Sequence, residues 1–534
     1  MLHALSPRER TLAIAAGVVF VLAGASQIAL AIQTHSAWIP VAAGSYREGV
    51  VGQPIALNPI LSANPADQDI STLIYSRLTD LATTIETDAE FRTYTVKLAE
   101  DLTWDDGVPL TSDDVVFTVK MVQDPDVRSP FAMSWRGVVA ERVSELQVTF
   151  TLPSPFSFFR ESLARLPVIP QHIYGAVPPA NLHLSSYNLE PVGSGPYRVK
   201  GYEERRDGFI TEYRLVPNER YRGTPPFIQD FYFLFFSTNE ELQDAFRLRR
   251  VDGFGLSLPP ASGVPVLAAA VTERIPMTRY YAIFMNQLTK PSLKDDNFRL
   301  ALLESIDRDR IVREAFGGEG TLVNSPWLAG GGMPSYDPAG ARDHLVAAKV
   351  DSKDIILAVP QIPALQKAAE LIKGDWDAVG IAPVSIVTAP PGDFVDTVVR
   401  GRNYELLLFG NTLEHSEDLY PFWHSSERLA PGLNLSLYQN AEVDRLLETN
   451  RQTGEEKKRG ANLERITTLL VKDNPALFLF TLPYLYIHRD NLQGFPARAT
   501  DTAQSGGHPQ TLVIPSDRLR DAAKWSVAQV RVLQ

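Results

Sequence analysis

The stretch that decides the fold is residues 104–118, WDDGVPLTSDDVVFT. Asp106 and Gly107 predict a tight turn, because glycine tolerates a positive φ and aspartate can hydrogen-bond its own backbone. Thr111 and Asp114 have the spacing of a capping box with Asp in place of Glu, so a helix is expected to begin directly after Thr111. Apolar residues then recur at helical spacing and predict a buried face. We therefore expect these aspartates to form turns and caps and not to bind a ligand.

Four further segments follow in order along the chain: PVGSGPY (191–197), NERYRGTPP (218–226), FRLALLESIDRDRI (298–311) and NLSLYQNAEVDRLL (434–447). The two glycines around Ser194 lack the spacing of a nucleophile elbow, so a tight turn feeding a strand is expected there. In the last segment Asn440 is expected to cap a helix whose core face carries Val443 and Leu446.

Taken together, the five segments resemble the extracellular solute-binding proteins of family 5, the peptide and nickel receptors of ABC importers. The resemblance covers residues 48–490. It implies an α/β fold with two lobes, of the periplasmic-binding-protein type II, with an extra subdomain in lobe I. It also implies that a hinge between the lobes closes on the ligand.

The predicted domain organisation has four parts. Residues 1–35 form an N-terminal membrane anchor or signal segment, and residues 36–275 form lobe I, which includes an inserted subdomain at about 71–188. Residues 276–489 form lobe II, and residues 490–534 return to lobe I and end in a tail. Within lobe I, the apolar spacing predicts one helical stretch from Asp67 to Leu81. A strand from Tyr484 to His488 is expected to cross back toward lobe I.

Composition excludes several classes of protein. The 534 residues carry a net charge of −12, which argues against nucleic-acid binding because no basic stripe balances the acidic surplus. The absence of cysteine excludes disulfides, thiolate metal sites and anchoring through a lipid-modified cysteine.

The N-terminus predicts a location outside the cytoplasm. Arg8 and Arg10 precede an uncharged, mostly apolar run at residues 11–32. A helix of about 20 residues spans a bilayer, so this run favours an uncleaved anchor. Ala29-Leu30-Ala31 would also suit a signal peptidase, and a cleaved signal stays open as the alternative. The arginines place the N-terminus inside. The rest of the chain is then expected on the extracytoplasmic face of the membrane, or in the periplasm or medium after cleavage.

The candidate binding loop is residues 410–426, which follow a predicted strand at 404–409. Ligands of open α/β sheets bind at the C-terminal ends of strands. Peptide-binding members of the family resembled here carry G-W-x-x-D in this loop, and the aspartate pairs with the α-ammonium of the peptide. Counted from Gly410, Asn411 takes the tryptophan position and Glu414 the aspartate position. Glu414 keeps the charge with a longer reach, whereas the loss of the aromatic departs from the standard peptide mode.

Four other residues are candidate ligand contacts. Asp418 either contacts the ligand or caps the short helix through Trp423. Asn434 lies where relatives turn toward the cleft, Asn286 ends a predicted strand, and Trp327 either lines the cleft or packs in the core.

We expect no metal and no cofactor. His415 and His424 lack the spacing of an H-x-x-x-H pair. Surface or hydrogen-bonded histidines are therefore expected in place of a nickel site.

The resemblance implies a receptor that captures oligopeptides or similar small solutes and delivers them to the transmembrane subunits of an ABC permease. We expect it to act as a monomer attached to the membrane through its N-terminal helix. The alternative is a surface-anchored sensor or interaction module that kept the fold without transport. An enzyme is not expected, because no metal quartet, phosphate loop or nucleophile elbow is recognisable in the sequence.

Overall fold

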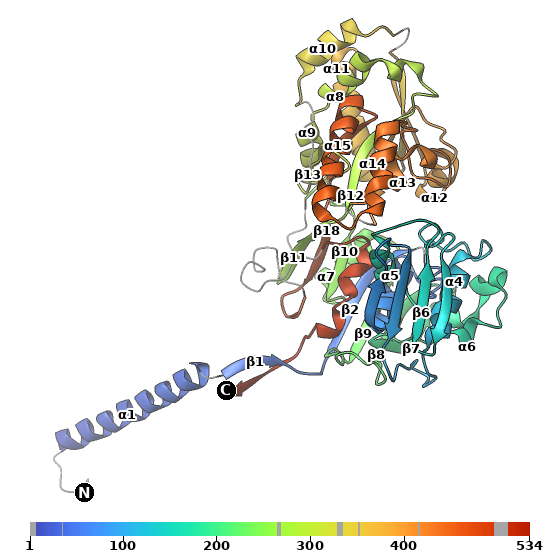
Figure 1. The fold of residues 1–534 in the computed structure, drawn as a ribbon. Helices are drawn as coiled ribbons and strands as arrows, with labels where there is room; N and C mark the ends of the chain where they lie inside the picture. Colours follow the sequence, from blue (N-terminus) through green and yellow to red (C-terminus); the bar gives the residue numbers. More distant parts are fainter. Residues whose placement is uncertain are drawn as a thin grey trace.

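Two lobes, each built on its own β-sheet, make up the body of the molecule (Figure 1). The computed structural model describes residues 7–34, 36–62, 64–263, 269–327, 335–350, 353–414, 417–495 and 511–533. The seven-stranded sheet of lobe I has the order β11 (Ala270–Ile275), β18 (Tyr484–Arg489), β10 (Gly253–Leu256), β2 (Ser45–Val51), β9 (Asp230–Phe236), β8 (Ile210–Pro217) and β7 (Tyr197–Glu204). The six-stranded sheet of lobe II has the order β13 (Thr321–Leu322), β17 (Ala476–Thr481), β12 (Arg279–Met285), β16 (Leu406–Thr412), β14 (Ile355–Pro360) and β15 (Val384–Ala389). The predicted two-lobed α/β fold is confirmed.

A smaller, antiparallel sheet lies in the part of lobe I where the inserted subdomain is predicted. Its order is β3 (Ala82–Thr87), β4 (Thr93–Leu98), β6 (Gln147–Thr151) and β5 (Val139–Ser144). The α-helices of lobe I are α2 (Pro65–Ile74), α3 (Leu78–Leu81), α4 (Ser112–Gln123), α5 (Phe159–Arg165), α6 (Gln171–Tyr174) and α7 (Asn239–Arg247). The limits of about 71 and 188 for the subdomain stay a prediction.

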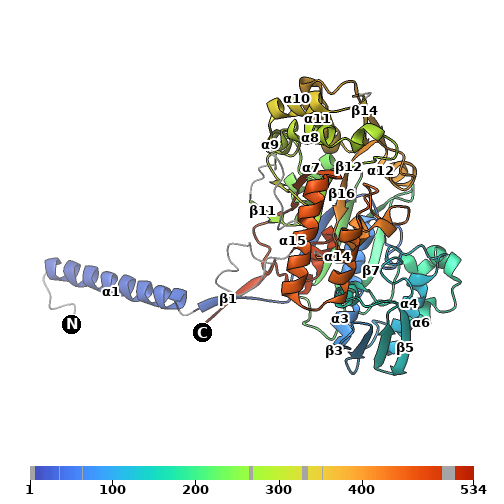
Figure 2. The same ribbon diagram turned by 45° about the horizontal axis from the view of Figure 1, so that its top comes forward.

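Helices pack on the sheet of lobe II. They are α8 (Asp296–Glu304), α9 (Arg308–Ala315), α10 (Pro338–Ala347), α11 (Pro363–Val379), α12 (Pro391–Phe394), α13 (Tyr420–Trp423), α14 (Ala441–Gln452) and α15 (Glu456–Asp473). Asn440 caps α14 as expected, and Val443 and Leu446 are buried. In Figure 2, α14 and α15 extend from lobe II toward the small sheet of lobe I.

The chain passes between the two large sheets twice, from β11 to β12 and from β17 to β18. The six-stranded sheet therefore ends at Thr481, because β18 pairs with β10 and β11 in lobe I. This return to lobe I begins earlier than the predicted boundary at residue 489. The strand expected at Tyr484–His488 is present as β18.

The 104–118 stretch forms the turn and the capped helix that its sequence predicts. Gly107 has a φ of +94°, and Asp106 accepts a hydrogen bond from the Val108 amide at 3.0 Å. Thr111 and Asp114 form a capping box at the start of α4.

The second motif packs directly on this stretch. The amide of Asp105 donates to the Gly193 carbonyl at 2.9 Å, and the Gly193 amide donates to the Asp105 carboxylate at 3.3 Å. Burial raises the pKa of Asp105 to about 6. Gly193 also lies against the end of α2, where a Cβ on Gly193 would sit 2.2 Å from the Ile74 carbonyl oxygen. The two motifs are therefore in direct contact, and Gly193 allows the close approach to the end of α2.

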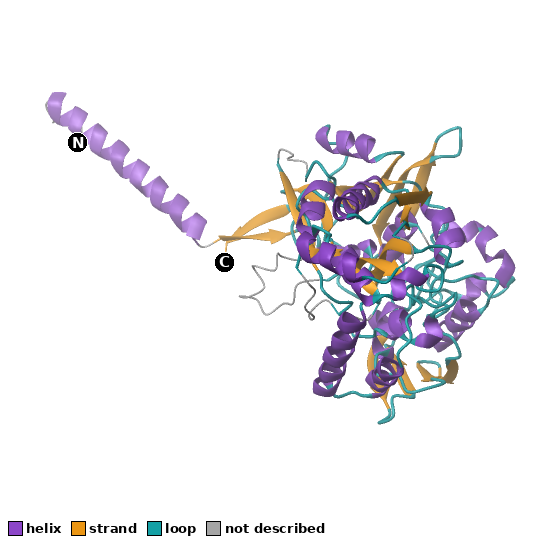
Figure 3. Ribbon diagram, turned by 90° about the horizontal axis from the view of Figure 1, so that it is seen from above, coloured by secondary structure: helices purple, strands orange, loops and turns teal. Residues whose placement is uncertain are grey.

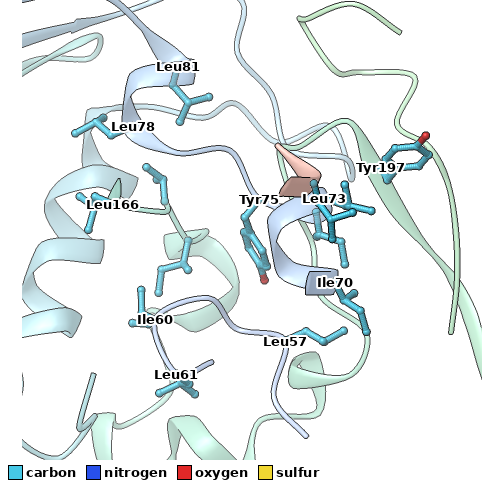
Figure 4. Packing of buried hydrophobic residues seen from close by; sticks show 14 of the residues in the cluster. Leu57, Ile60, Leu61, Ile70, Leu73, Tyr75, Leu78, Leu81, Leu166 and Tyr197 are labelled. Atoms are coloured by element: carbon cyan, nitrogen blue, oxygen red, sulfur yellow. The ribbon is translucent and has the colours of Figure 1, made fainter. Parts of the chain in front are cut away.

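The prediction of a single helix from Asp67 to Leu81 is wrong, because two separate helices, α2 and α3, form there. Tyr75 and Arg77 are extended. The Val168 amide donates to the Ser76 carbonyl at 3.2 Å, and the Ser76 hydroxyl donates to the Ser194 carbonyl at 2.9 Å. These long-range bonds compete with helix continuation, which sequence spacing alone does not reveal. Figure 4 shows how residues from both helices, among them Leu73 and Leu78, pack in the core of lobe I.

The N-terminal helix α1 (Pro7–Thr34) projects away from the two lobes (Figure 3). It leads into β1 (Ser36–Pro40), which pairs with the C-terminal strand β19 (Gln529–Leu533) in an antiparallel ribbon. In the part of the chain that the structure describes, no helix combines the length and the apolar character needed to cross a membrane.

A buried network of charges joins distant parts of lobe I. The guanidinium of Arg518 donates to Glu48 at 2.6 Å and to both carboxylate oxygens of Asp69, at 2.8 and 2.7 Å. Tyr486 donates to the other oxygen of Glu48 at 2.7 Å. Burial raises the pKa of Glu48, while Arg518 counters that rise by favouring the charged carboxylate. We call Glu48, Asp69 and Arg518 the buried triad.

We expect the variant Arg518→Met to lower the stability of lobe I by about 3–5 kcal/mol, because it leaves two carboxylates buried without their cation. Guanidinium unfolding followed by tryptophan fluorescence measures this, since Trp525 packs against Tyr486. Arg247→Met is the matched control. Its ion pair with Asp244 is exposed, so a change within about 0.5 kcal/mol is expected. Equal unfolding midpoints for the two variants would contradict the role given to Arg518.

The close approach at Gly193 gives a second test. Gly193→Ala should destabilise the protein by about 1–3 kcal/mol, because its Cβ overlaps the backbone of α2. Gly374→Ala is the control, because nothing lies within 4 Å of a Cβ there and alanine favours the helix by about 0.5–1 kcal/mol. Thermal unfolding of both variants should give shifts of opposite sign. A Gly193→Ala protein as stable as the wild type would be evidence against the contact.

Candidate functional site

A cavity of about 450 Å³ lies between the two lobes. Its walls come from residues between 130 and 162 of lobe I and from residues between 412 and 451 of lobe II. This volume is within the usual range of roughly 300–1,000 Å³ for small-molecule sites. The cavity opens beside the loop that follows β16, which is the loop that sequence analysis selects.

Glu414 reaches the cavity from lobe II. Ser134 Oγ, in lobe I, donates to Glu414 Oε2 at 3.0 Å, so this hydrogen bond crosses between the lobes. Glu414 has no ion pair within the described residues, and its side chain is exposed. A carboxylate in this position can accept hydrogen bonds from a cationic group of a ligand.

Asp418 also lines the cavity, but its charge is already neutralised. Arg451 binds it with two nitrogens, Nε at 2.9 Å and a terminal nitrogen at 2.7 Å. The Asp418 carboxylate accepts a further hydrogen bond from the Tyr420 amide at 3.3 Å. Asp418 thus accepts from the first amide of α13, whose N-cap residue is Leu419, and orients Arg451.

Arg451 makes contacts with both lobes. Its guanidinium carbon lies 3.9 Å from the ring centre of Tyr420 and 5.0 Å from that of Phe156, which belongs to lobe I. The Ser157 amide donates to the Arg451 carbonyl at 2.7 Å.

Arg459 is held against lobe I in a similar way. Arg459 pairs with Glu417 at 2.8 Å and lies 5.5 Å from the ring of Phe158. Two consecutive acids of the loop therefore hold two arginines against two phenylalanines of the opposite lobe. We define the interlobe clasp as Arg451 and Arg459 with Phe156 and Phe158.

Arg402 supports the far wall of the cavity. Its guanidinium donates to the carbonyls of Val399, Arg428 and Gly432 at 2.6, 3.0 and 2.6 Å. Burial lowers the pKa of Arg402. These bonds fix the segment that carries Leu433 into the cavity.

Asn411 and Asn286 do not line the cavity. Asn411 is buried and donates to the Tyr280 hydroxyl at 3.2 Å, on the strand beside β16. Asn286 donates to the Arg402 carbonyl at 3.2 Å and accepts from the Leu288 amide. Because β12 and β16 are antiparallel, with Met285 opposite Leu406, Asn286 lies at the end of the sheet opposite to Glu414.

Asn434 and Trp327 lie within lobe II. Asn434 is fully buried and its amide bonds to the backbone of His424 and Tyr438. Trp327 packs against the hydrophobic cluster of lobe II that includes Trp423. As ligand contacts, all six candidates stay predictions, and the structure brings Glu414 and Asp418 together at the cavity.

The described residues contain no group of three metal-ligating side chains that could hold an ion. His424 stacks on Tyr420, with ring centres 4.1 Å apart, and its Nδ1 is 2.8 Å from the Ser426 hydroxyl. The predicted role of His415 lies outside the described residues.

Sequence analysis missed Ser134, Arg136, Phe156 and Arg451, which line the cavity. Phe156 follows directly after the sequence Pro-Ser-Pro (153–155), which predicts a turn there but does not indicate that Phe156 faces a cavity. Arg451 lies 33 residues after its partner Asp418, and no spacing rule connects the two.

This chain is similar to known proteins over most of its length. A sequence model described as "Bacterial extracellular solute-binding proteins, family 5 Middle" matches residues 78–429. "Oligopeptide-binding protein AppA" of Bacillus subtilis (strain 168) is 24% identical over 499 residues, which cover 86% of this chain and 90% of that protein. "Protein XP55" of Streptomyces lividans is 28% identical over 510 residues, which cover 87% of this chain and 89% of that protein.

The solved structure of AppA from Bacillus subtilis in complex with a nonapeptide shares the fold. It superposes with a TM-score of 0.73 at 22% identity and covers 92% of this chain and 100% of that chain. Two lobes of this kind are therefore a known architecture.

The interlobe clasp can be tested by removing one arginine. Arg459→Met should shift the equilibrium toward a more open arrangement of the lobes by roughly 2- to 30-fold, since a cation–π contact contributes about 0.5–2 kcal/mol. Arg465→Met on the same helix is the control, because its exposed ion pair with Glu442 does not cross between lobes.

Single-molecule energy transfer between labels on Glu86→Cys and Lys367→Cys would measure the distance between lobes. Both positions are exposed, and the chain has no cysteine of its own to compete for the label. If Arg459→Met and Arg465→Met gave the same distance distribution as the wild type, the clasp would not contribute to closure.

Proposed function

We propose that this chain, which belongs to the bacterial extracellular solute-binding proteins of family 5, is the substrate-binding receptor of an ABC importer. It captures oligopeptides or similar small solutes in the cavity between its lobes. The observation that carries the proposal is the cavity itself, because both lobes supply its walls and the Ser134–Glu414 hydrogen bond joins the two lobes at its edge. A ligand bound there contacts both lobes at once and favours the closed arrangement over the open one.

Glu414 is the proposed partner of the positively charged end of the ligand. The neighbouring acids Glu417 and Asp418 are each held by an arginine, whereas Glu414 has only a serine as its partner among the described residues. An ammonium group would gain a charge-assisted hydrogen bond from this carboxylate.

The relatives named above include proteins described as oligopeptide-binding, and this agrees with a peptide ligand. Closure around the ligand and delivery to a membrane permease require no chemical change of the ligand, so we propose a binding protein and not an enzyme. We propose that it acts as a monomer.

The family is described as extracellular, which places the proposed site outside the cytoplasm. Attachment through residues 1–35 and release after cleavage of a signal remain the two proposals for how the protein reaches that location.

The role of Glu414 predicts a specific loss of affinity. Glu414→Gln should weaken binding of a tripeptide with a free amino terminus by roughly 10- to 150-fold, because a hydrogen bond to a charged group contributes about 1.5–3 kcal/mol. Titration calorimetry or native mass spectrometry of the purified protein measures this change. The same tripeptide with an acetylated amino terminus should bind both proteins equally.

Glu464→Gln is the matched control, since Glu464 is exposed on α15 and does not line the cavity. Unchanged affinity of Glu414→Gln for the free tripeptide would remove Glu414 from the site. Recovery of a metal or a sugar with the purified protein would contradict the peptide ligand.

A further inference from the structure

We propose that the cavity selects peptides that carry a bulky apolar side chain and disfavours those with an acidic one. This inference rests on the proposed function and adds the class of ligand. It follows from the described charged side chains of the cavity that have no ion pair, from the apolar side chains in its walls and from the fixed orientation of Arg451.

Among the described residues, five charged side chains line the cavity, and two of them neutralise each other. The pair is Asp418 and Arg451, joined by three hydrogen bonds from two nitrogens of the guanidinium. The remaining charges are the carboxylates of Glu414 and Glu427 from lobe II and the guanidinium of Arg136 from lobe I. Two carboxylates thus face one guanidinium, which suits a ligand with an ammonium and a single carboxylate. A second carboxylate on the ligand would meet repulsion from the surplus negative charge.

Apolar side chains from both lobes form part of the walls, beside polar and charged ones. Lobe I provides Leu152, Phe156 and Phe159, and lobe II provides Phe422 and Leu433. Leu433 retains 45% of its accessible surface, and so does Met133 on the opposite wall. An apolar side chain of a ligand would cover this surface and remove it from water, which is favourable.

Arg451 is held in a fixed orientation where the lobes meet. Arg451 lies between the rings of Tyr420 and Phe156, one from each lobe, at 3.9 and 5.0 Å. Asp418 fixes the orientation of Arg451 from the other side. Asp418 and Tyr420 both belong to lobe II, so Arg451 is already oriented before the lobes close, and less ordering is needed when the ligand binds.

The test uses peptides that differ in one side chain. The set is trialanine and the tripeptides in which each alanine in turn is replaced by leucine or by aspartate. Titration calorimetry with the purified full chain should give at least one leucine peptide that binds about tenfold or more tightly than trialanine. The aspartate peptide with the same substituted position should bind more weakly than trialanine.

Matched variants of two exposed leucines connect this preference with the cavity. Leu433→Ser should reduce the ratio of leucine-peptide to trialanine affinity, because it removes part of the wall. Leu429→Ser should leave the ratio unchanged, since Leu429 is 72% exposed in the same loop and does not line the cavity. Both side chains are exposed enough for the variants to fold, and circular dichroism would verify that they do.

Three outcomes are distinguishable. A leucine preference that Leu433→Ser reduces and Leu429→Ser preserves supports the inference. Peptides that bind without any preference for leucine, or with a preference that Leu433→Ser leaves intact, overturn the inference but leave the proposed function standing. Failure of every peptide in the set to bind overturns both.

Discussion

The buried triad of Glu48, Asp69 and Arg518 is the constraint on which the rest of lobe I depends. The three side chains are at most 5% exposed, and a buried charge without a partner costs several kcal/mol. The strand β2, the helix α2 and the C-terminal segment around Arg518 must therefore assemble together. This assembly completes the sheet that holds β10 and β18, where the chain returns from lobe II.

Within the cavity, pairing of charges decides which acid is available to a ligand. Three acids lie close together on the loop after β16, and two of them bind arginines that face the opposite lobe. Only Glu414 is held by a neutral group, Ser134, in the described part of the chain. The same loop therefore supplies both the attachment between lobes and one of the two cavity carboxylates that have no ion pair among the described residues. With the proposed role of Glu414, closure and ligand binding would be connected, because both would depend on neighbouring residues of one short segment.

Local features of the sequence predicted local structure well. The capping box at Thr111, the cap at Asn440 and the strand at β18 depend on residues within a few positions of each other, and all three are present. The break between α2 and α3 was not predictable, because it results from bonds to residues near 168 and 194. The same limit applies to the site: the loop at Glu414 follows from strand order, whereas the pairing of Asp418 with Arg451 requires the folded chain. Spacing rules describe neighbours in sequence, and the cavity is made of neighbours in space.

The most direct measurement of the central claim is a crystal structure of the protein saturated with a short leucine-containing peptide. We expect the peptide between the lobes, with its ammonium within hydrogen-bond distance of Glu414 and its leucine against Phe156 and Phe422. Arg451 should still be paired with Asp418. A peptide bound elsewhere, or bound in the cavity with its ammonium turned away from Glu414, would contradict the assignment of this cavity as the site.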